Sequence, residues 1–248
     1  MFSNKHKEMY SQINALTREF RPRLNVIKDK NGNALTDQEK IGERWAEYCR
    51  EMYDSSEIIP PQMPPNKEDD LPPLKSEVEW AIRQLPSGKS AGVDNIYAEM
   101  IKVSGDPGVE LYHKLCLKIW ETEQWPEEWR KSAFVTLPKK GGLQQCSNYR
   151  TIDLISHASK ILLKIIMKRL ENTISREVNE TPAGFRGTRD QIMNLRNMIE
   201  KTRETNTEMY MCFIEYTKAF DCVSHNKLLN GLKTFKVHYK IINLIQDL

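Results

Sequence analysis

The sequence predicts an α+β fold in which long helices are interspersed with short strands. Stretches with apolar residues three or four positions apart recur along the chain and indicate amphipathic helices. Short segments rich in β-branched residues lie between them and favour strands. Apolar residues make up 39% of the chain and charged residues 29%, which is typical of a folded domain rather than a disordered one.

The first element expected is a β-hairpin. Residues 24–35, "LNVIKDKNGNAL", contain Asn31-Gly32, a dipeptide suited to a tight hairpin turn. Thr36 and Glu39 then have the spacing of a capping box, which predicts that a helix begins there.

A proline-rich segment separates this part from the rest. Residues 54–75 hold six of the twelve prolines and read as a linker. Ser76 and Glu79 repeat the capping-box spacing, and Pro86 ends the helix that follows. Helices are predicted over 36–53, 76–85, 107–122, 159–174, 188–204, 224–234 and 239–247, and strands over 132–138 and 209–216.

These elements suggest four parts along the chain. They are a hairpin and helix region (1–53), a linker (54–75), a helical region (76–131) and an α+β region (132–248).

Several classes of protein are disfavoured. The N-terminus has no apolar segment typical of a secretory signal, and no apolar stretch reaches about 18 residues. The five cysteines are odd in number, scattered and without a Cys-x-x-Cys pair, which points to a reducing compartment and against a zinc site. The expected location is therefore cytoplasmic or nuclear, with no membrane contact.

Charge is distributed unevenly. The whole chain carries +3, but residues 130–203 contain 15 Lys and Arg against 6 Asp and Glu, a local excess of +9. Such a basic stretch suggests a polyanionic partner. Solvated helix faces would explain the same charge. Charge alone does not decide between a polyanionic partner and solvated helix faces.

Two basic motifs stand at strand ends or in loops. "LPKKGG" places Lys139 just past a predicted strand, and Arg150 of "NYR" follows on the returning segment. Two such cations could hold a triphosphate. "AGFR", with Gly184, Phe185 and Arg186, could contact a nucleic-acid backbone or a stacked base. Taken singly, each motif is also compatible with an ordinary solvated loop.

The stretch "MCFIEYTKAFDCV" holds the remaining candidates. Glu215 lies at the end of a predicted strand, and Asp221 follows six residues later. A buried carboxylate needs a cation or a hydrogen-bonding partner. An Mg²⁺ ion would satisfy Glu215, and so would an arginine.

The order of these motifs is far more specific than any one of them. "FVTLPKKG", "CSNYRTIDLISHASKILLKIIMKRL", "AGFR", "DQIMNLR" and "CFIEYTKAFDCV" together closely resemble the reverse transcriptase of LINE-type, non-LTR retrotransposons. Within that family, the chain looks nearest to the RTE/BovB-like clade. The resemblance runs from about residue 40 to the last residue.

The resemblance implies a right-hand polymerase fold, here fingers and the start of the palm, and RNA-directed DNA synthesis with Mg²⁺. Lys139 and Arg150 would bind the phosphates of the incoming nucleotide, and Phe220 would stand against a ribose 2′-hydroxyl. The loop with Gly184, Phe185 and Arg186 would contact the template. Glu215 would occupy the position of the first metal-binding acid.

Two departures bear on activity. The family pattern has Asp where this chain has Glu215, and Mg²⁺ tolerates little displacement of its ligands. The only Asp-Asp pair, Asp69-Asp70, lies in the proline-rich linker and not in a palm motif. We therefore expect a truncated, inactive segment of a reverse transcriptase. The alternative is a non-catalytic module that binds single-stranded nucleic acid.

The expected partners follow from the same reading. They are RNA or other single-stranded nucleic acid, held weakly and without sequence preference, and further copies of the chain. Self-association would occur through unpaired backbone of the palm strand at 209–216.

Overall fold

The computed structural model describes residues 26–53, 71–139, 141–174, 188–214, 218 and 220–248. They fall into two compact units. The first comprises Met1–Glu51 and Thr136–Thr151, and the second comprises Met52–Val135 and Ile152–Leu248.

The first unit begins with the predicted hairpin. Strands β1 (Ile27–Lys28) and β2 (Ala34–Leu35) pair antiparallel, with Ile27 opposite Leu35. The carboxylate of Asp29 closes the turn, because its Oδ1 accepts the backbone N–H of Asn33 at 2.8 Å. The hairpin prediction is confirmed.

Helix α2 (Gln38–Tyr53) follows, but Thr36 and Glu39 do not cap it. Asp37 supplies the cap instead, since its Oδ1 accepts the N–H of Glu39 at 2.8 Å. A carboxylate in this place satisfies a free N–H and also carries negative charge against the positive end of the helix dipole. The predicted capping box at this helix is therefore wrong.

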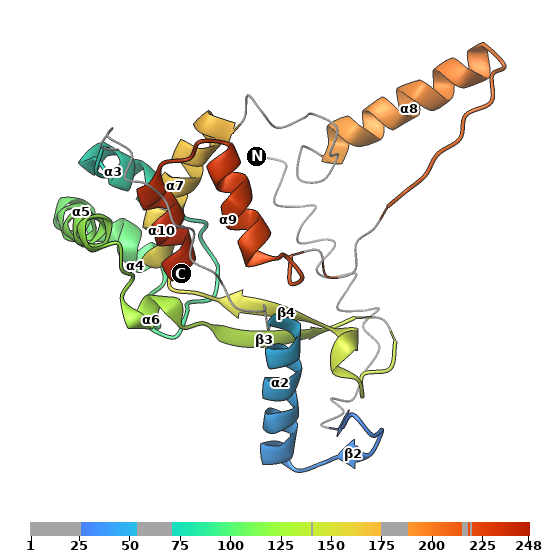
Figure 1. Ribbon diagram of the computed structural model, residues 1–248, viewed down its shortest axis with the longest axis horizontal. Coiled ribbons are helices and arrows are strands. Elements are labelled where there is room, and N and C mark those ends of the chain that lie inside the picture. Colours follow the sequence, from blue (N-terminus) through green and yellow to red (C-terminus); the bar gives the residue numbers. More distant parts are fainter. Residues whose placement is uncertain (1–25, 54–70, 140, 175–187, 215–217, 219) are drawn as a thin grey trace. The chain divides into compact units, whose positions relative to one another are not determined.

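The second unit is mainly helical (Figure 1). Its helices are α3 (Lys75–Arg83), α4 (Ala98–Val103), α5 (Gly105–Thr122), α6 (Glu127–Arg130), α7 (Ser159–Ile174), α8 (Thr188–Glu204), α9 (His225–Thr234) and α10 (Tyr239–Asp247). Each predicted helix is present, with its ends displaced by two residues at most. The short helices α4 and α6 were not predicted, because neither is long enough to show an apolar period.

Helix α3 also starts differently from the prediction. The backbone N–H of Leu74 donates to Oε2 of Glu77 at 2.8 Å, so the capping acid is Glu77 and not Glu79. Glu79 instead forms an ion pair with Arg83 one turn later. Glu77 is also held by Arg169 of α7, at 2.7 Å from Nη2. This tertiary contact has no local sequence signal.

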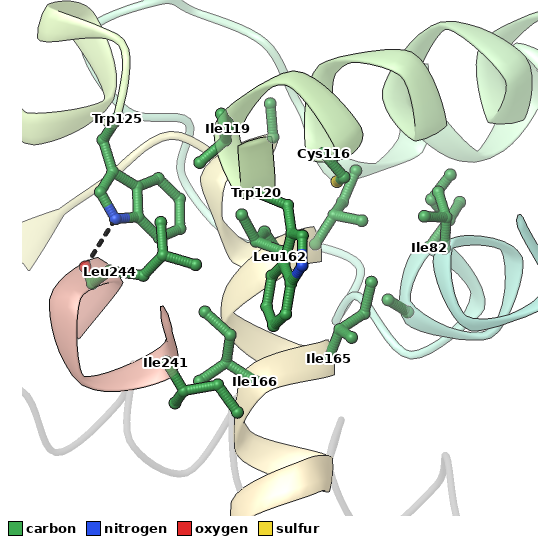
Figure 2. Packing of buried hydrophobic residues seen from close by; sticks show 14 of the residues in the cluster. Ile82, Cys116, Ile119, Trp120, Trp125, Leu162, Ile165, Ile166, Ile241 and Leu244 are labelled. Atoms are coloured by element: carbon green, nitrogen blue, oxygen red, sulfur yellow. Dashed lines mark hydrogen bonds between the residues drawn. The ribbon is translucent and has the colours of Figure 1, made fainter. Parts of the chain in front are cut away.

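A single hydrophobic cluster joins α3, α5, α7, α9 and α10. Helix α7 contributes two adjacent rows of fully buried residues: Ile161, Leu162, Ile165 and Ile166. Figure 2 shows the side chains that surround them, which come from α3 (Ile82), α5 (Cys116, Ile119, Trp120) and α10 (Ile241, Leu244). Burial of this apolar face, at about 25 cal/mol per Å², is the main force that holds the helices together.

Polar contacts lock the edges of this cluster. The indole Nε1 of Trp125 donates to the carbonyl of Leu244 at 2.8 Å, as Figure 2 shows, and its backbone N–H donates to Asp247. The guanidinium of Arg169 lies 5.1 Å from the ring centre of Trp120, a cation–π contact.

The segment after α3 is fitted closely against the turn that precedes α7. His157 is fully buried, and its Nε2 lies 3.1 Å from the carbonyl oxygen of Ser90. Asp94 accepts the hydroxyl of Ser156. A Cβ placed on Gly92 would lie 2.7 Å from backbone atoms of Ile155 and Ser156, so only glycine fits there.

The chain also forms a second pair of strands. Strands β3 (Ala133–Pro138) and β4 (Tyr149–Leu154) form a two-stranded sheet, and the predicted strand at 132–138 is confirmed. The predicted strand at 209–216 is not found in its described part, because residues 209–214 have no regular structure. A strand needs a neighbour for its backbone hydrogen bonds, and none of the described strands pairs with this segment.

Candidate nucleotide and nucleic-acid site

Two hydrogen bonds connect the residues that flank the turn between β3 and β4. The backbone N–H of Lys139 donates to the carbonyl of Asn148 at 2.8 Å, and the side-chain amide of Asn148 donates to the carbonyl of Gly142 at 2.8 Å. Gly141 has φ +119°, a conformation that side chains rarely adopt. The "KKGG" sequence is therefore suited to reverse the chain directly after Lys139.

Other residues of the first unit contact this loop and the strand that follows it. The ring of Tyr149 meets the ring of Trp45 of α2 edge to face, with centres 5.2 Å apart. The hydroxyl of Tyr149 donates to the carbonyl of Leu143 at 2.9 Å, and the N–H of Lys28 donates to Gln144 at 2.7 Å. A packed Tyr149 places its neighbour Arg150 on the opposite side of the strand.

Lys139 and Arg150 are both exposed. Within the described part of the chain, neither forms an ion pair with a carboxylate. An exposed lysine contributes point charge, and an exposed guanidinium can contact a phosphate through two N–H groups at once. Chemically, this strand pair can bind a phosphate group.

Other cations of the basic stretch are engaged elsewhere. Arg130 pairs with Asp247, Lys131 with Glu127, Arg169 with Glu77 and Arg196 with Glu200. Some of these acids lie outside residues 130–203 and offset part of the local excess of +9. These four cations form ion pairs within the folded chain, whereas Lys139 and Arg150 are available for a ligand.

Phe220 lies in a turn of the second unit, and its side chain is 71% exposed. The N–H of Cys222 donates to the carbonyl of Lys218 at 3.1 Å, and Lys218 has φ +51°. Asp221 is partly buried, and the hydroxyl of Tyr53 donates to its Oδ1 at 3.5 Å.

A second carboxylate lies close to Asp221. Partial burial raises the pKa of Asp153 on β4, and the negative charge of Asp221 raises it further. Sequence reasoning did not single out Asp153 or Tyr53. The acid in "YRTID" is visible in the sequence as a charge between apolar residues, although no strand was predicted there. Nothing near Tyr53 indicates a contact with a residue 168 positions later.

Four of the predicted site residues lie outside the described residues. They are Glu215, Gly184, Phe185 and Arg186. Among the residues that are described, no group of three His, Cys, Asp or Glu side chains could hold a metal ion.

Comparison with known proteins shows similarity to reverse transcriptases. Residues 137–247 match the family "Reverse transcriptase (RNA-dependent DNA polymerase)". The chain is also similar to the transposon TX1 uncharacterized 149 kDa protein of Xenopus laevis, with 23% identity over 92% of this chain and 19% of that protein. It is 28% identical to the probable RNA-directed DNA polymerase from transposon BS of Drosophila melanogaster, over 63% of this chain and 18% of that protein.

A further relative is the retrovirus-related Pol polyprotein from type-1 retrotransposable element R2 of Popillia japonica, 28% identical over 48% of this chain and 17% of that protein. The chain thus spans about a fifth of the length of these relatives. The matches confirm the resemblance to reverse transcriptases of non-LTR retrotransposons. They do not test the RTE/BovB assignment, which stays a prediction. In the described helices, no stretch is long and apolar enough to cross a membrane.

Proposed function

We propose that residues 132–248 are the fingers and the first palm motif of a retrotransposon RNA-directed DNA polymerase with right-hand architecture. The match of residues 137–247 to the reverse transcriptase family carries the proposal. The two cations expected to bind nucleotide phosphates, Lys139 and Arg150, support it, because among the described residues both are exposed and neither pairs with a carboxylate.

Each site residue then has a role. Lys139 and Arg150 bind the phosphates of a nucleoside triphosphate at the β3–β4 strand pair. Phe220 stands against the ribose and disfavours a 2′-hydroxyl. Gly184, Phe185 and Arg186 contact the template, and the RNA contact is weak and independent of sequence.

Reverse transcriptases use Mg²⁺, and Glu215 stands where the first metal-binding acid is expected. Two-metal phosphoryl transfer needs carboxylates that hold both ions about 3.5–4 Å apart. The family's palm supplies an Asp-Asp pair for this purpose, and the only such pair in this sequence, Asp69-Asp70, lies in the proline-rich linker. The activity we assign to the isolated 248-residue polypeptide is therefore binding, without nucleotide transfer.

Nucleotide binding provides the direct test. Replacing Lys139 and Arg150 together by Ala should raise the Kd of a fluorescent dNTP by about 10-fold or more, since hydrogen bonds to charged groups contribute about 1.5–3 kcal/mol. The matched control replaces Lys131 and Lys168, two exposed lysines that already pair with Glu127 and Glu171. Equal Kd values for the parent and the Lys139/Arg150 variant would refute the assignment.

RNA binding tests the partner. The parent should bind single-stranded RNA with a Kd of about 10⁻⁴ to 10⁻⁶ M at physiological salt. Replacing Lys139, Lys140 and Arg150 by Ala should flatten the slope of log K against log salt by about two to three units. Equal binding of variant and parent at every salt concentration would exclude this site.

Primer extension tests whether the polypeptide transfers nucleotides to a primer. With an RNA template and Mg²⁺ or Mn²⁺, the purified chain should incorporate no nucleotide. Template-dependent incorporation above that of a Glu215→Ala control would show that the polypeptide is a complete polymerase.

A further inference from the structure

The turn that carries Phe220 depends on its surroundings for its conformation. Phe220 is 71% exposed, so the conformation of its turn contributes to where the ring lies. Lys218 adopts φ +51°, a left-handed conformation that is uncommon for a residue with a side chain. Residues in such conformations persist when neighbouring contacts hold them.

Two consecutive residues at the end of α2 supply such contacts. The Nζ of Lys218 lies 3.0 Å from the sulfur of Met52, and the hydroxyl of Tyr53 donates to Oδ1 of Asp221 at 3.5 Å. The ring of Tyr53 in turn packs near the ring of Phe134 on β3, with centres 6.0 Å apart. All these residues belong to the second unit. Tyr53 therefore links the turn to the sheet.

The hydrogen bond from Tyr53 to Asp221 lies beside a second carboxylate, that of Asp153. Asp153 and Asp221 are close enough that the charge of Asp221, added to partial burial, raises the pKa of Asp153. Two neighbouring carboxylates repel each other when both are ionised. The Tyr53 hydroxyl offers Asp221 a donor that offsets this repulsion. Loss of this donor would leave Asp221 beside Asp153 with one hydrogen bond fewer.

We propose that Tyr53 is a positioning residue for Phe220. By holding Asp221, it fixes the neighbouring Phe220 and so contributes to the choice between deoxyribonucleotides and ribonucleotides. This inference rests on the proposed function, in which Phe220 stands against the sugar. It adds a residue from α2, which precedes the matched segment 137–247.

The test uses Tyr53→Phe in the full 248-residue chain, which removes one oxygen and keeps the ring beside Phe134. Tyr97→Phe is the matched control, because Tyr97 lies at the start of α4 and is 45% exposed. The first readout is amide hydrogen exchange over residues 218–224. We expect exchange about 3-fold to 10-fold faster in Tyr53→Phe, with α7 unchanged in both variants.

The second readout is sugar selectivity, measured as the ratio of Kd values for fluorescent ATP and dATP with Mg²⁺. We expect the ratio to fall by about 3-fold in Tyr53→Phe and to stay constant in Tyr97→Phe. If Tyr53 had only a structural role, the substitution would weaken the binding of both nucleotides equally and leave the ratio of Kd values unchanged.

Each outcome decides a separate point. Unchanged exchange over 218–224 overturns the positioning role. Faster exchange with an unchanged ratio overturns the link to sugar selection. If the parent binds neither nucleotide, the proposed nucleotide site fails together with sugar selection, while the exchange experiment still decides whether Tyr53 holds the turn.

Discussion

Helices α7 and α8 have similar lengths and similar apolar periods, yet one is buried and the other is not. In α7, Ile161 and Leu162 are 0% exposed, whereas Ile192 and Met198 of α8 are 62% and 58% exposed. The residues after α8 continue the contrast, since Phe213 and Ile214 are 77% and 76% exposed. An apolar period shows which face of a helix could be buried, and a packing partner decides whether it is.

The residues that stabilise the fold are also different from the residues proposed to bind ligands. The buried face of α7 packs within the helical cluster, which holds the second unit together. The candidate ligand contacts Lys139, Arg150 and Phe220 lie instead in exposed loops and strand ends. Binding residues commonly lie on loops that a rigid scaffold positions. Substitutions can therefore probe the scaffold and the site independently.

The largest expected difference in stability is between alanine substitutions of apolar residues on the two helices. Leu162→Ala should lower the free energy of unfolding by about 3–4 kcal/mol, because it leaves a cavity among packed side chains. Ile192→Ala on α8 should cost about 0.5 kcal/mol or less. Urea unfolding followed by circular dichroism measures both. Equal losses would mean that α8 is packed as tightly as α7.

Loss of an ion pair should likewise lower the free energy of unfolding more on α7 than on α8. Arg169 of α7 donates to Glu77 and to the carbonyls of Leu71 and Pro72, so Arg169→Ala should cost about 2–3 kcal/mol. Arg196 of α8 is 73% exposed and pairs only with Glu200 among the described residues, so Arg196→Ala should cost about 0–0.5 kcal/mol. The same unfolding experiment compares them, and a larger loss for Arg196→Ala would contradict the assignment.

The pair between Arg169 and Glu77 should also make the helical cluster sensitive to acid. Burial acts to raise the pKa of Glu77, but hydrogen bonds from Arg169 and from the Leu74 N–H outweigh it and hold the pKa below its ordinary value of 4.5. A lowered pKa stabilises the fold above pH 4.5, and this contribution is lost as the pH falls through the lowered pKa.

Thermal unfolding at pH 7, 5, 4 and 3 checks this dependence. Glu77→Gln should be less stable than the parent at pH 7, and the gap between them should narrow below pH 4.5. If the stability difference between parent and variant stays constant over this range, ionisation of Glu77 does not cause the acid sensitivity.

The smallest perturbation is chemical labelling of the native thiols. Cys116 of α5 is 1% exposed, and burial raises its pKa to about 12, whereas Cys212 and Cys222 are exposed. Since the thiolate is the reactive form, Ellman's reagent should modify Cys212 and Cys222 first and Cys116 only after unfolding. Replacing Cys212 and Cys222 by Ala should abolish the fast phase. Rapid reaction of Cys116 in the native protein would show that the cluster opens readily.

The sequence by itself determined the local elements. The apolar period placed α7 and α8 with the bounds that the structure has, and Asn31-Gly32 placed the hairpin. The order of basic and acidic motifs was enough to indicate a reverse transcriptase segment. Each of these signals acts over a few residues or as a linear order, so it can be read without knowledge of the fold.

The tertiary structure alone decided which contacts those elements make. Asp37 replaced the predicted Thr36 box at α2, and Glu77, held by Arg169 across 92 residues, replaced the predicted Glu79 at α3. The contact of Tyr53 with Asp221 is equally invisible in the sequence. Hydrogen bonds and burial between distant segments depend on where the chain brings them together, and no local pattern encodes that meeting.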